Sequence, residues 1–189
     1  MANRLITDNI LVAFEVMHHI SEKRGGKVGE MALKLYISKA YDRVEWNGLE
    51  QIMVRMGFHS RWINTIMHCL TLVTYSIRIN GVPYGHITLT KWLRQGDPLS
   101  LYLFLLCAEG LSSCTRKAAL KERINGISIC WRGSQLSHLF FADDNLLFCQ
   151  ATLEKCAEFM RILQVYEASA GQQLNQSKTS LFFSQNTPQ

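Results

Sequence analysis

Two adjacent aspartates, Asp143 and Asp144, interrupt a stretch of the chain that is otherwise almost wholly apolar, over residues 139–142 and 146–148. Neighbouring carboxylates repel each other, and burying either without a partner costs free energy, so a chain that places them between core-forming strands generally has a cation to satisfy them. A divalent metal ion is the first candidate. The alternative is that Asp-Asp-Asn is a polar turn of a hairpin, because Asp and Asn tolerate tight turns.

Composition sets broad limits on what the protein can be. The 189 residues suit one domain or a large part of a longer protein, and a hydrophobic content of 48% is enough for a core. The net charge of +5 is compatible with a polyanionic partner without being diagnostic of one. Six cysteines without a C-x-x-C pair indicate neither a zinc site nor a disulfide framework, so buried, reduced thiols are expected.

The chain has no evident targeting signal. Residues 1–4 lack the apolar core of a signal peptide, and the most apolar stretch, Leu99 to Ala108, is too short to span a bilayer. An intracellular protein is expected, nuclear or cytoplasmic and not secreted, with no membrane partner. The oligomeric state is left open.

Hydrophobic spacing predicts helices alternating with hairpins. Asp42 and Glu45 have capping-box spacing, Ser60 is a possible cap, Asn80-Gly81 is a hairpin turn, and Asp97 precedes a proline at a helix start. Helices are predicted over residues 8–24, 43–56, 60–70, 98–114 and 152–170. Strands are predicted over residues 31–37, 74–79, 127–131, 139–149 (as a hairpin) and 181–183, with a further strand after Asn80-Gly81 that pairs with residues 74–79.

This order of elements favours an α+β fold. Hairpins between helices indicate an antiparallel sheet covered by helices on one face, with Met31, Leu33, Leu35 and Ile37 on the core side of the first strand. A single domain over residues 1–189 is expected, with residues 184–189 as a disordered tail.

Three segments stand out together by their order and content. They are the strand that runs through Tyr36 into Ser-Lys-Ala-Tyr-Asp42, the loop Leu-Arg-Gln-Gly-Asp-Pro-Leu-Ser100, and the hairpin Phe-Ala-Asp-Asp144. With them the chain resembles the reverse transcriptase domain of plant non-LTR (LINE-type) retrotransposons, from Arg4 to Lys178.

The resemblance implies a polymerase palm-type antiparallel sheet backed by helices, with partial fingers and without the thumb and upstream fingers. It implies an RNA-directed DNA polymerase, a nucleotidyltransferase that uses an RNA template, a DNA primer and deoxynucleoside triphosphates. Two Mg²⁺ ions clamped between palm carboxylates are expected as cofactors: one activates the primer hydroxyl and the other neutralises the triphosphate, so the carboxylates must converge from separate strands. Asp143 and Asp144 match the family's paired acids.

The family's third acid is missing. Members of the family usually carry an aspartate where this chain has Tyr36, on the strand face opposite Leu35 and Ile37. A phenol is uncharged near neutral pH and bulkier than a carboxylate, so it cannot supply the charge that two Mg²⁺ ions demand. The hypothesis is that this copy is a strongly impaired polymerase. Asp42, six positions on, is expected to cap a helix rather than to replace the lost ligand.

The resemblance assigns further residues to nucleotide and template. Tyr41 matches the aromatic gate that selects deoxynucleotides, with a core aromatic as the alternative, and the loop of Arg94, Gln95 and Gly96 matches the one placed against nucleotide and template. Three cations are also matched: Lys178 to a lysine near the nucleotide phosphates, and Arg4 and Lys39 to possible contacts with nucleic acid backbone. Each could equally be a solvated surface residue.

Two more positions depart from the family's pattern. Trp92 stands where the family usually has glycine, and Leu101 where it usually has proline. A tryptophan in that loop is expected to strain the turn or obstruct the cleft. The alternatives to an impaired polymerase are a non-catalytic nucleic-acid-binding remnant and a metal-dependent nuclease, although the Arg-Gln-Gly-Asp-Pro loop argues against the nuclease.

Overall fold

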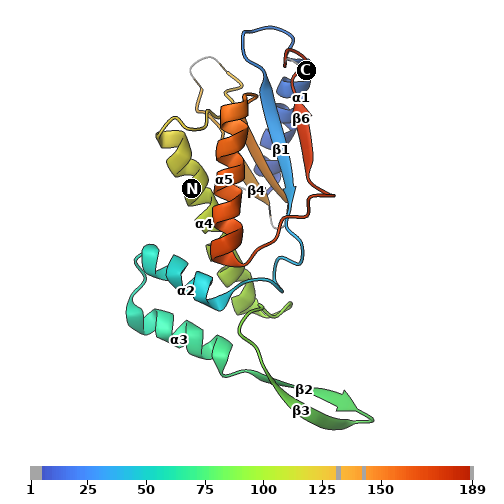
Figure 1. Cartoon of the computed structure of the whole chain (residues 1–189), viewed down its shortest axis with the longest axis vertical. Helices are drawn as coiled ribbons and strands as arrows, with labels where there is room; N and C mark the ends of the chain where they lie inside the picture. Colours follow the sequence, from blue (N-terminus) through green and yellow to red (C-terminus); the bar gives the residue numbers. More distant parts are fainter. Residues whose placement is uncertain (1–5, 131–132, 142–143, 188–189) are drawn as a thin grey trace. The chain divides into compact units, whose positions relative to one another are not determined.

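The computed structural model describes residues 6–130, 133–141 and 144–187, and the chain forms two compact units (Figure 1). The sheet unit comprises Met1–Ser38, Leu111–Val165 and Leu174–Gln189. The ribbon unit comprises Lys39–Gly110 and Tyr166–Gln173. Each unit is described by itself. That the whole chain is one domain stays a prediction.

The sheet unit is built on a four-stranded antiparallel sheet in the order β4-β5-β1-β6. Its strands are β1 (Glu30–Tyr36), β4 (His138–Phe141), β5 (Asp144–Gln150) and β6 (Ser180–Phe183). β1 and β5 lie in the centre and pair without a shift from Glu30↔Gln150 to Tyr36↔Asp144. The predicted α+β fold with a palm-type antiparallel sheet is confirmed.

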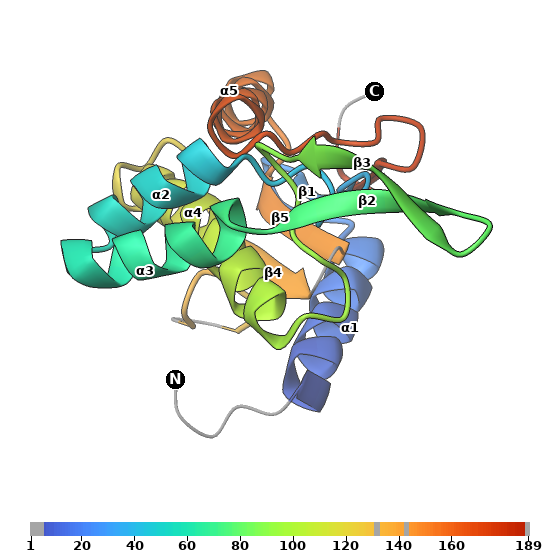
Figure 2. The same ribbon diagram turned by 90° about the horizontal axis from the view of Figure 1, so that it is seen from below.

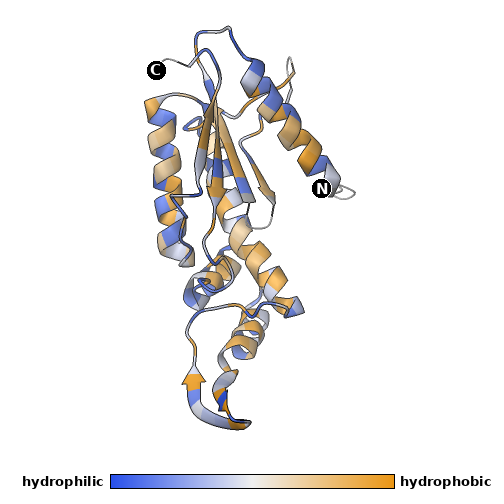
Figure 3. Cartoon of the chain, turned by 90° about the vertical axis from the view of Figure 1, so that its right-hand side faces the viewer, coloured by the Kyte–Doolittle hydropathy of each residue, from blue (hydrophilic) through white to orange (hydrophobic). Residues whose placement is uncertain are grey.

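Helices cover both faces of this sheet, whereas the sequence predicts cover on one face. α1 (Ile6–Glu22) and α5 (Leu153–Ala170) lie on opposite sides of the strands (Figures 2 and 3). The prediction is wrong because β1 buries side chains on both faces, with Met31, Leu33 and Leu35 on one face and Ala32 on the other. Met31 contacts Cys156 of α5, with 3.4 Å between their sulfur atoms, while Ala32 points to the other side.

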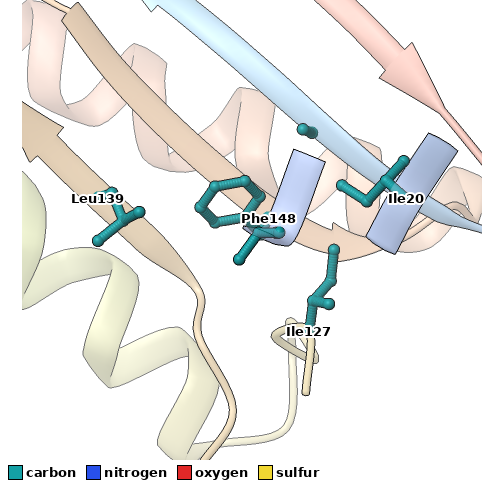
Figure 4. Packing of buried hydrophobic residues seen from close by; sticks show 6 residues of the cluster. Ile20, Ile127, Leu139 and Phe148 are labelled. Atoms are coloured by element: carbon teal, nitrogen blue, oxygen red, sulfur yellow. The ribbon is translucent and has the colours of Figure 1, made fainter. Parts of the chain in front are cut away.

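The core on the α1 side is a small apolar cluster. Ala32 of β1 and its cross-strand partner Phe148 of β5 are fully buried against Val16 and Ile20 of α1 (Figure 4). Ile127 and Leu139 complete the cluster. Burial of this kind stabilises the fold by roughly 25 cal/mol per Å² of apolar surface removed from water.

The ribbon unit contains helices and one β-hairpin. The helices are α2 (Trp46–Arg55), α3 (Ser60–Thr71) and α4 (Pro98–Leu120) up to Gly110, and the hairpin pairs β2 (Thr74–Ile79) with β3 (Val82–Thr88). Positive φ angles at Asn80 and Gly81 form its turn, as the sequence predicts. Asp97 caps α4, since its Oδ1 accepts a hydrogen bond of 2.9 Å from the N–H of Leu99, and Pro98 is the first helical residue.

Two predicted caps are wrong. α2 begins after Glu45, which has no side-chain capping bond, so Asp42 lies outside the helix in the preceding turn. α3 begins after His59, whose Nδ1 accepts a hydrogen bond from the N–H of Arg61, and Ser60 is already helical. The ring nitrogen of His59 thus caps α3 in place of the predicted Ser60 hydroxyl, because any acceptor that reaches the free N–H groups of the first turn can cap a helix.

The segments around β6 and before β4 also differ from expectation. Within residues 127–131 only a single bridge forms, Ile127↔Leu136, and Trp131 lies outside the described residues.

The segment after β6 forms hydrogen bonds as far as Thr187. Ser184 is buried, and its Oγ accepts a hydrogen bond from the N–H of Glu30. The side-chain amide of Asn186 donates to the carbonyls of Gly25 and Gly26. A tail expected to be disordered is therefore bonded to the α1–β1 connection over its described part.

The cysteines are free, as expected, but only some are buried. Cys107 and Cys149 are buried, and burial raises the pKa of each thiol to about 12, which keeps both protonated and unreactive at neutral pH. Cys69, Cys114 and Cys130 are exposed, so the expectation of buried thiols is wrong for these three.

α4 is longer than the apolar stretch recognised in the sequence. With 23 residues and a mean hydropathy of 1.2, it could cross a membrane by length and composition alone, as a core helix of many proteins could. Leu103, Phe104 and Cys107 of this helix are buried in the protein.

Phe148→Ala should lower the free energy of unfolding by about 3–5 kcal/mol, because the ring is fully buried and its removal leaves a cavity in the α1 cluster. Urea denaturation measures the change. Phe14→Ala is the matched control, since that ring is 72% exposed and its loss should cost less than about 0.5 kcal/mol. Equal losses at the two positions would contradict the assignment of the core.

Candidate functional site

The end of β1 lies directly beside the start of the aspartate-bearing strand. Tyr36, the last residue of β1, is the antiparallel register partner of Asp144, the first residue of β5, and Asp144 pairs on its other side with Phe141 of β4. Asp143 lies outside the described residues. Tyr36, predicted to stand in place of a third acid, is thus in register with Asp144 on the neighbouring strand.

Tyr36 is half-buried, and a lysine cation lies over its ring. The Nζ atom of Lys178 is 4.5 Å from the centroid of the phenol ring, within the range of a cation–π interaction. The carbonyl of Tyr36 accepts a hydrogen bond of 2.8 Å from the N–H of Asn175. Tyr36 is therefore bonded through its backbone and its ring to the segment before β6.

Asn175 organises the turn that carries Lys178. Its Oδ1 accepts hydrogen bonds from the N–H of Lys178 at 3.2 Å and from the Oγ of Ser177 at 2.6 Å, and its carbonyl accepts from the Thr179 hydroxyl at 2.8 Å. An asparagine that bonds its own turn in this way fixes the backbone without a helix or strand. Sequence reasoning singled out Lys178 but missed Asn175, although the Asn-Gln-Ser-Lys segment carried the signal of such a turn.

The groups at position 36 do not fit a divalent cation. The phenol ring of Tyr36 and the ammonium group of Lys178 lie here, whereas Mg²⁺ prefers carboxylate and water oxygens. Within residues 6–130, 133–141 and 144–187, no three His, Cys, Asp or Glu side chains lie close enough to hold a metal ion. That position 36 has lost a metal ligand stays a prediction.

In the ribbon unit, Tyr41 is a stacked aromatic. Its ring lies 4.8 Å from that of Phe104 on α4, at an angle of 22° between their planes, and its carbonyl accepts a hydrogen bond of 2.8 Å from the N–H of Leu93. The ring is half-buried, so one side is covered by Phe104. This arrangement suits a core aromatic and leaves the role as a nucleotide gate a prediction.

The loop of Arg94, Gln95 and Gly96 is exposed. The guanidinium of Arg94 donates to the hydroxyl of Tyr75 on β2 at 3.4 Å and lies 5.5 Å from the centroid of the same ring. The hydrogen bond to Tyr75 raises the pKa of Arg94, so the side chain stays charged. The sequence does not identify Tyr75 as the partner of Arg94, because the residues around Tyr75 show only the alternation that is common to strands.

Gly96 is required by its backbone conformation. Its φ angle is +85°, and a Cβ atom added there would have open space around it. The glycine therefore serves the turn into α4 rather than a close approach of backbone within the protein.

Lys39 and Asp42 form the turn that follows β1 in the chain. Lys39 is exposed, has a φ angle of +51°, and its carbonyl accepts a hydrogen bond of 3.0 Å from the N–H of Asp42. A solvated cation at this turn is available to a polyanion, and its role stays a prediction. Arg4 lies outside the described residues.

Trp92 adopts a backbone conformation that favours glycine. Its φ angle is +103°, which for a residue with a bulky side chain costs about 1–3 kcal/mol. Surrounding groups hold it there: its N–H donates to the carbonyl of Val44 at 3.0 Å, its carbonyl accepts from the indole N–H of Trp46 at 2.9 Å, and its ring lies 5.2 Å from that of Tyr75. The sequence predicts strain in this turn, and the structure has it in the backbone of Trp92.

The family model described as "Reverse transcriptase (RNA-dependent DNA polymerase)" matches residues 3–188. The chain belongs to this family. The family's general activity is RNA-directed DNA polymerisation with divalent metal ions, and the predicted relationship to non-LTR reverse transcriptases is confirmed.

Two relatives are similar in sequence to parts of this chain. An uncharacterised mitochondrial protein of Arabidopsis thaliana is 50% identical over 66 residues, which is 35% of this chain and 54% of that protein. The retrovirus-related Pol polyprotein from the type-1 retrotransposable element R2 of Popillia japonica is 26% identical over 151 residues, or 76% of this chain and 20% of the polyprotein. The chain thus spans about half of the first relative and a fifth of the second.

The fold is similar to that of telomerase. Apo telomerase from Candida tropicalis, truncated from its C-terminal domain, superposes with a TM-score of 0.64 at 14% identity, over 96% of this chain and 36% of the telomerase chain. Telomerase from the same organism in complex with a fragment of telomeric RNA gives a TM-score of 0.67 at 12% identity, over 96% of this chain and 30% of that one. At such low identity the likeness establishes the fold alone, a polymerase palm-type fold.

Trp92→Gly should be more stable than Trp92→Ala by about 1 kcal/mol, because both variants lose the indole ring but only glycine adopts a positive φ without strain. Thermal or urea denaturation of the two variants measures the difference. Trp62, inside α3, is the matched control: there alanine should be more stable than glycine by about 1 kcal/mol. The same order of stability at both positions would contradict strain at Trp92.

Proposed function

We propose that the chain is the palm region, with part of the fingers, of an RNA-directed DNA polymerase from a non-LTR retroelement, and that nucleotide addition by it is strongly impaired. The observation that carries the proposal is the register of Tyr36 opposite Asp144. Two-metal nucleotidyl transfer requires carboxylates that converge from separate strands, and one of the two strands supplies a phenol instead.

The surroundings of position 36 support the impairment. The Lys178 cation over the ring adds a positive charge at the place where the family mechanism needs a negative one. If the missing ligand removes about 4 kcal/mol of transition-state stabilisation, the rate falls roughly a thousandfold. An RNA template, a DNA primer and deoxynucleoside triphosphates are the partners of this activity, with Asp143 and Asp144 as the remaining metal ligands.

Other residues singled out in the sequence contact the nucleotide, the template or the nucleic acid backbone in this function. Arg94 and Gln95 are exposed and can donate hydrogen bonds to nucleotide or template, and Lys39 can contact a phosphate backbone. Arg4 is assigned the same backbone contact from its positive charge. Tyr41, covered on one side by Phe104, presents the remaining side of its ring to an incoming sugar.

Tyr36→Asp should raise the rate of nucleotide addition about a thousandfold, because it restores the third carboxylate. Single-nucleotide extension of a DNA primer on an RNA template measures it, both with the chain as it is and with a complete reverse transcriptase of the family that carries this chain as its palm region. Tyr36→Asn, which matches Asp in size without its charge, should give little gain. Extension by the unaltered chain at the rate of Tyr36→Asp would overturn the proposal.

A basic depression favours a second candidate function, nucleic acid binding without chemistry. In the sheet unit, a cavity of about 250 Å³ between α4 and α5 is lined by four cationic side chains, Lys117, Lys121, Arg123 and Arg161. Glu158 pairs with both arginines at 3.5 and 2.8 Å, and its pKa is lowered by the hydrogen bonds from Arg161 foremost, so a net positive charge is left. Such a surface suits a phosphodiester backbone.

The double substitution Lys117→Gln, Lys121→Gln should weaken RNA binding and reduce the slope of log K against log salt by about 2, one per lost phosphate contact. Fluorescence anisotropy with a labelled RNA from low to moderate salt measures the slope. As a control, the double substitution Lys27→Gln, Arg55→Gln removes the same amount of charge from residues that do not line the depression. This variant should leave the slope nearly unchanged. An equal reduction by both pairs would assign the effect to net charge alone.

A further inference from the structure

The β2–β3 hairpin of the ribbon unit is exposed on both faces. It forms a two-stranded sheet of its own, and all of its strand residues except Tyr75 are exposed. Figure 1 shows it extending away from α3. A two-stranded hairpin is only marginally stable when little packs against it, so an uncovered hairpin in a folded protein indicates a surface that a partner covers.

One face of the hairpin is apolar. Cross-strand partners lie on the same face of a hairpin, and so do alternate residues of one strand. The residues of this apolar face form three cross-strand pairs, which are Tyr75 with Ile87, Ile77 with Tyr84, and Ile79 with Val82. Apart from Tyr75, their exposed fractions run from 39% to 62%. A contiguous apolar surface of this kind marks a binding surface.

The segment that contains the hairpin has no acidic residue. Between Glu50 and Asp97 lie five of the chain's 20 basic residues and none of its 15 acidic ones. The rest of the chain, with 15 residues of each sign, is neutral, so this segment accounts for the whole net charge of +5. A cationic surface without carboxylates attracts polyanions.

Two arginines lie at opposite ends of the apolar face. At the turn, the Nε of Arg78 donates a hydrogen bond of 3.0 Å to the carbonyl of Gly81, which holds the guanidinium there. At the other end, the guanidinium of Arg94 lies over the ring of Tyr75, 5.5 Å from its centroid. Both arginines are exposed, so a phosphate group can reach either guanidinium.

We propose that the β2–β3 hairpin binds single-stranded nucleic acid, with bases stacked on the apolar face around Tyr84 and phosphates at Arg78 and Arg94. Unpaired bases offer flat faces that stack on aromatic side chains, whereas the bases of a duplex are already stacked on one another. The three cross-strand pairs are spaced about 7 Å apart along the strands, which is room for about two or three bases. This binding goes beyond the proposed function, because it does not involve the metal centre.

An anionic membrane would also attract the two arginines, but the turn of the hairpin argues against a membrane. Asn80 and Gly81 form the tip of the hairpin, and both are exposed. A hairpin that inserts into a bilayer needs an apolar tip, because polar groups without hydrogen bonds are costly in hydrocarbon. The apolar residues lie instead along a broad face, which suits stacked bases.

Fluorescence anisotropy of a labelled single-stranded oligonucleotide measures binding to the full chain without metal ions or deoxynucleotides. Tyr84→Ala should weaken binding about tenfold, because it removes the exposed ring on which a base stacks. Tyr84→Phe keeps a ring and should bind nearly as tightly as the unaltered chain. Tyr102→Ala is the matched control: this tyrosine of α4 is 65% exposed, against 62% for Tyr84, and its loss should leave the affinity unchanged.

Three results would overturn the inference: no binding by the unaltered chain, equal losses in Tyr84→Ala and Tyr102→Ala, or competition by a duplex as strong as that by the single strand. An effect of Tyr84→Ala on binding to phosphatidylserine vesicles, with oligonucleotide binding unchanged, would assign the hairpin to a membrane instead. Both tyrosines are exposed, so both alanine variants should keep the fold, which thermal denaturation checks.

Photocrosslinking locates the bound strand without any substitution. An oligonucleotide that carries 4-thiouridine should crosslink to the tryptic peptide of residues 79–91, which contains Tyr84. Crosslinks confined to α4 and α5 would assign binding to the basic depression between those helices and overturn the hairpin as the binding surface. Primer extension is not measured in either assay, so failure of the hairpin to bind would leave the proposed polymerase function standing.

Discussion

The pairing of β1 with β5 is the constraint on which the rest of the sheet unit depends. Seven consecutive residue pairs run without a bulge from Glu30↔Gln150 to Tyr36↔Asp144. Near one end, Ala32 and Phe148 are buried together under α1, and a slip of one residue would move both to the other face. The packing that fixes the register there also fixes which residue stands opposite Asp144 at the other end.

Most elements of the fold could be predicted because their signals are local. Alternation predicts β1, the hairpin turn follows from Asn80-Gly81, and Asp97 before a proline predicts the start of α4. The errors have a common cause, which is that they depend on contacts from elsewhere in the chain. The cover on the second face of the sheet needs α1 to reach Ala32, and the cap of α3 needs His59 to turn its ring toward its own helix.

The sequence predicts the candidate site as a set of residues and not as an arrangement. Sequence motifs identify Tyr36, Asp144 and Lys178 because those residue types stand in recognisable contexts, and the register of the sheet follows from hydrophobic pattern. The seat of Lys178 on the Tyr36 ring could not be predicted. It depends on a chain reversal at Asn175, more than a hundred residues from Tyr36, whose geometry is set by three short-range hydrogen bonds.

Tyr36 and Trp92 depart from the family's pattern with opposite physical consequences. Trp92 has a strained backbone that is held in place by its hydrogen bond to the carbonyl of Val44 and by one from the indole N–H of Trp46, and the strain lowers the stability of the ribbon unit. Tyr36 has a ring that packs against the Lys178 cation, and the β1–β5 pairing beside it needs no carboxylate at this position. Acids gathered for catalysis repel one another, and replacing one of them relieves that repulsion. The β1–β5 register does not depend on a metal ion, because the residues that hold it, among them Ala32, Leu35 and Phe148, are apolar and buried.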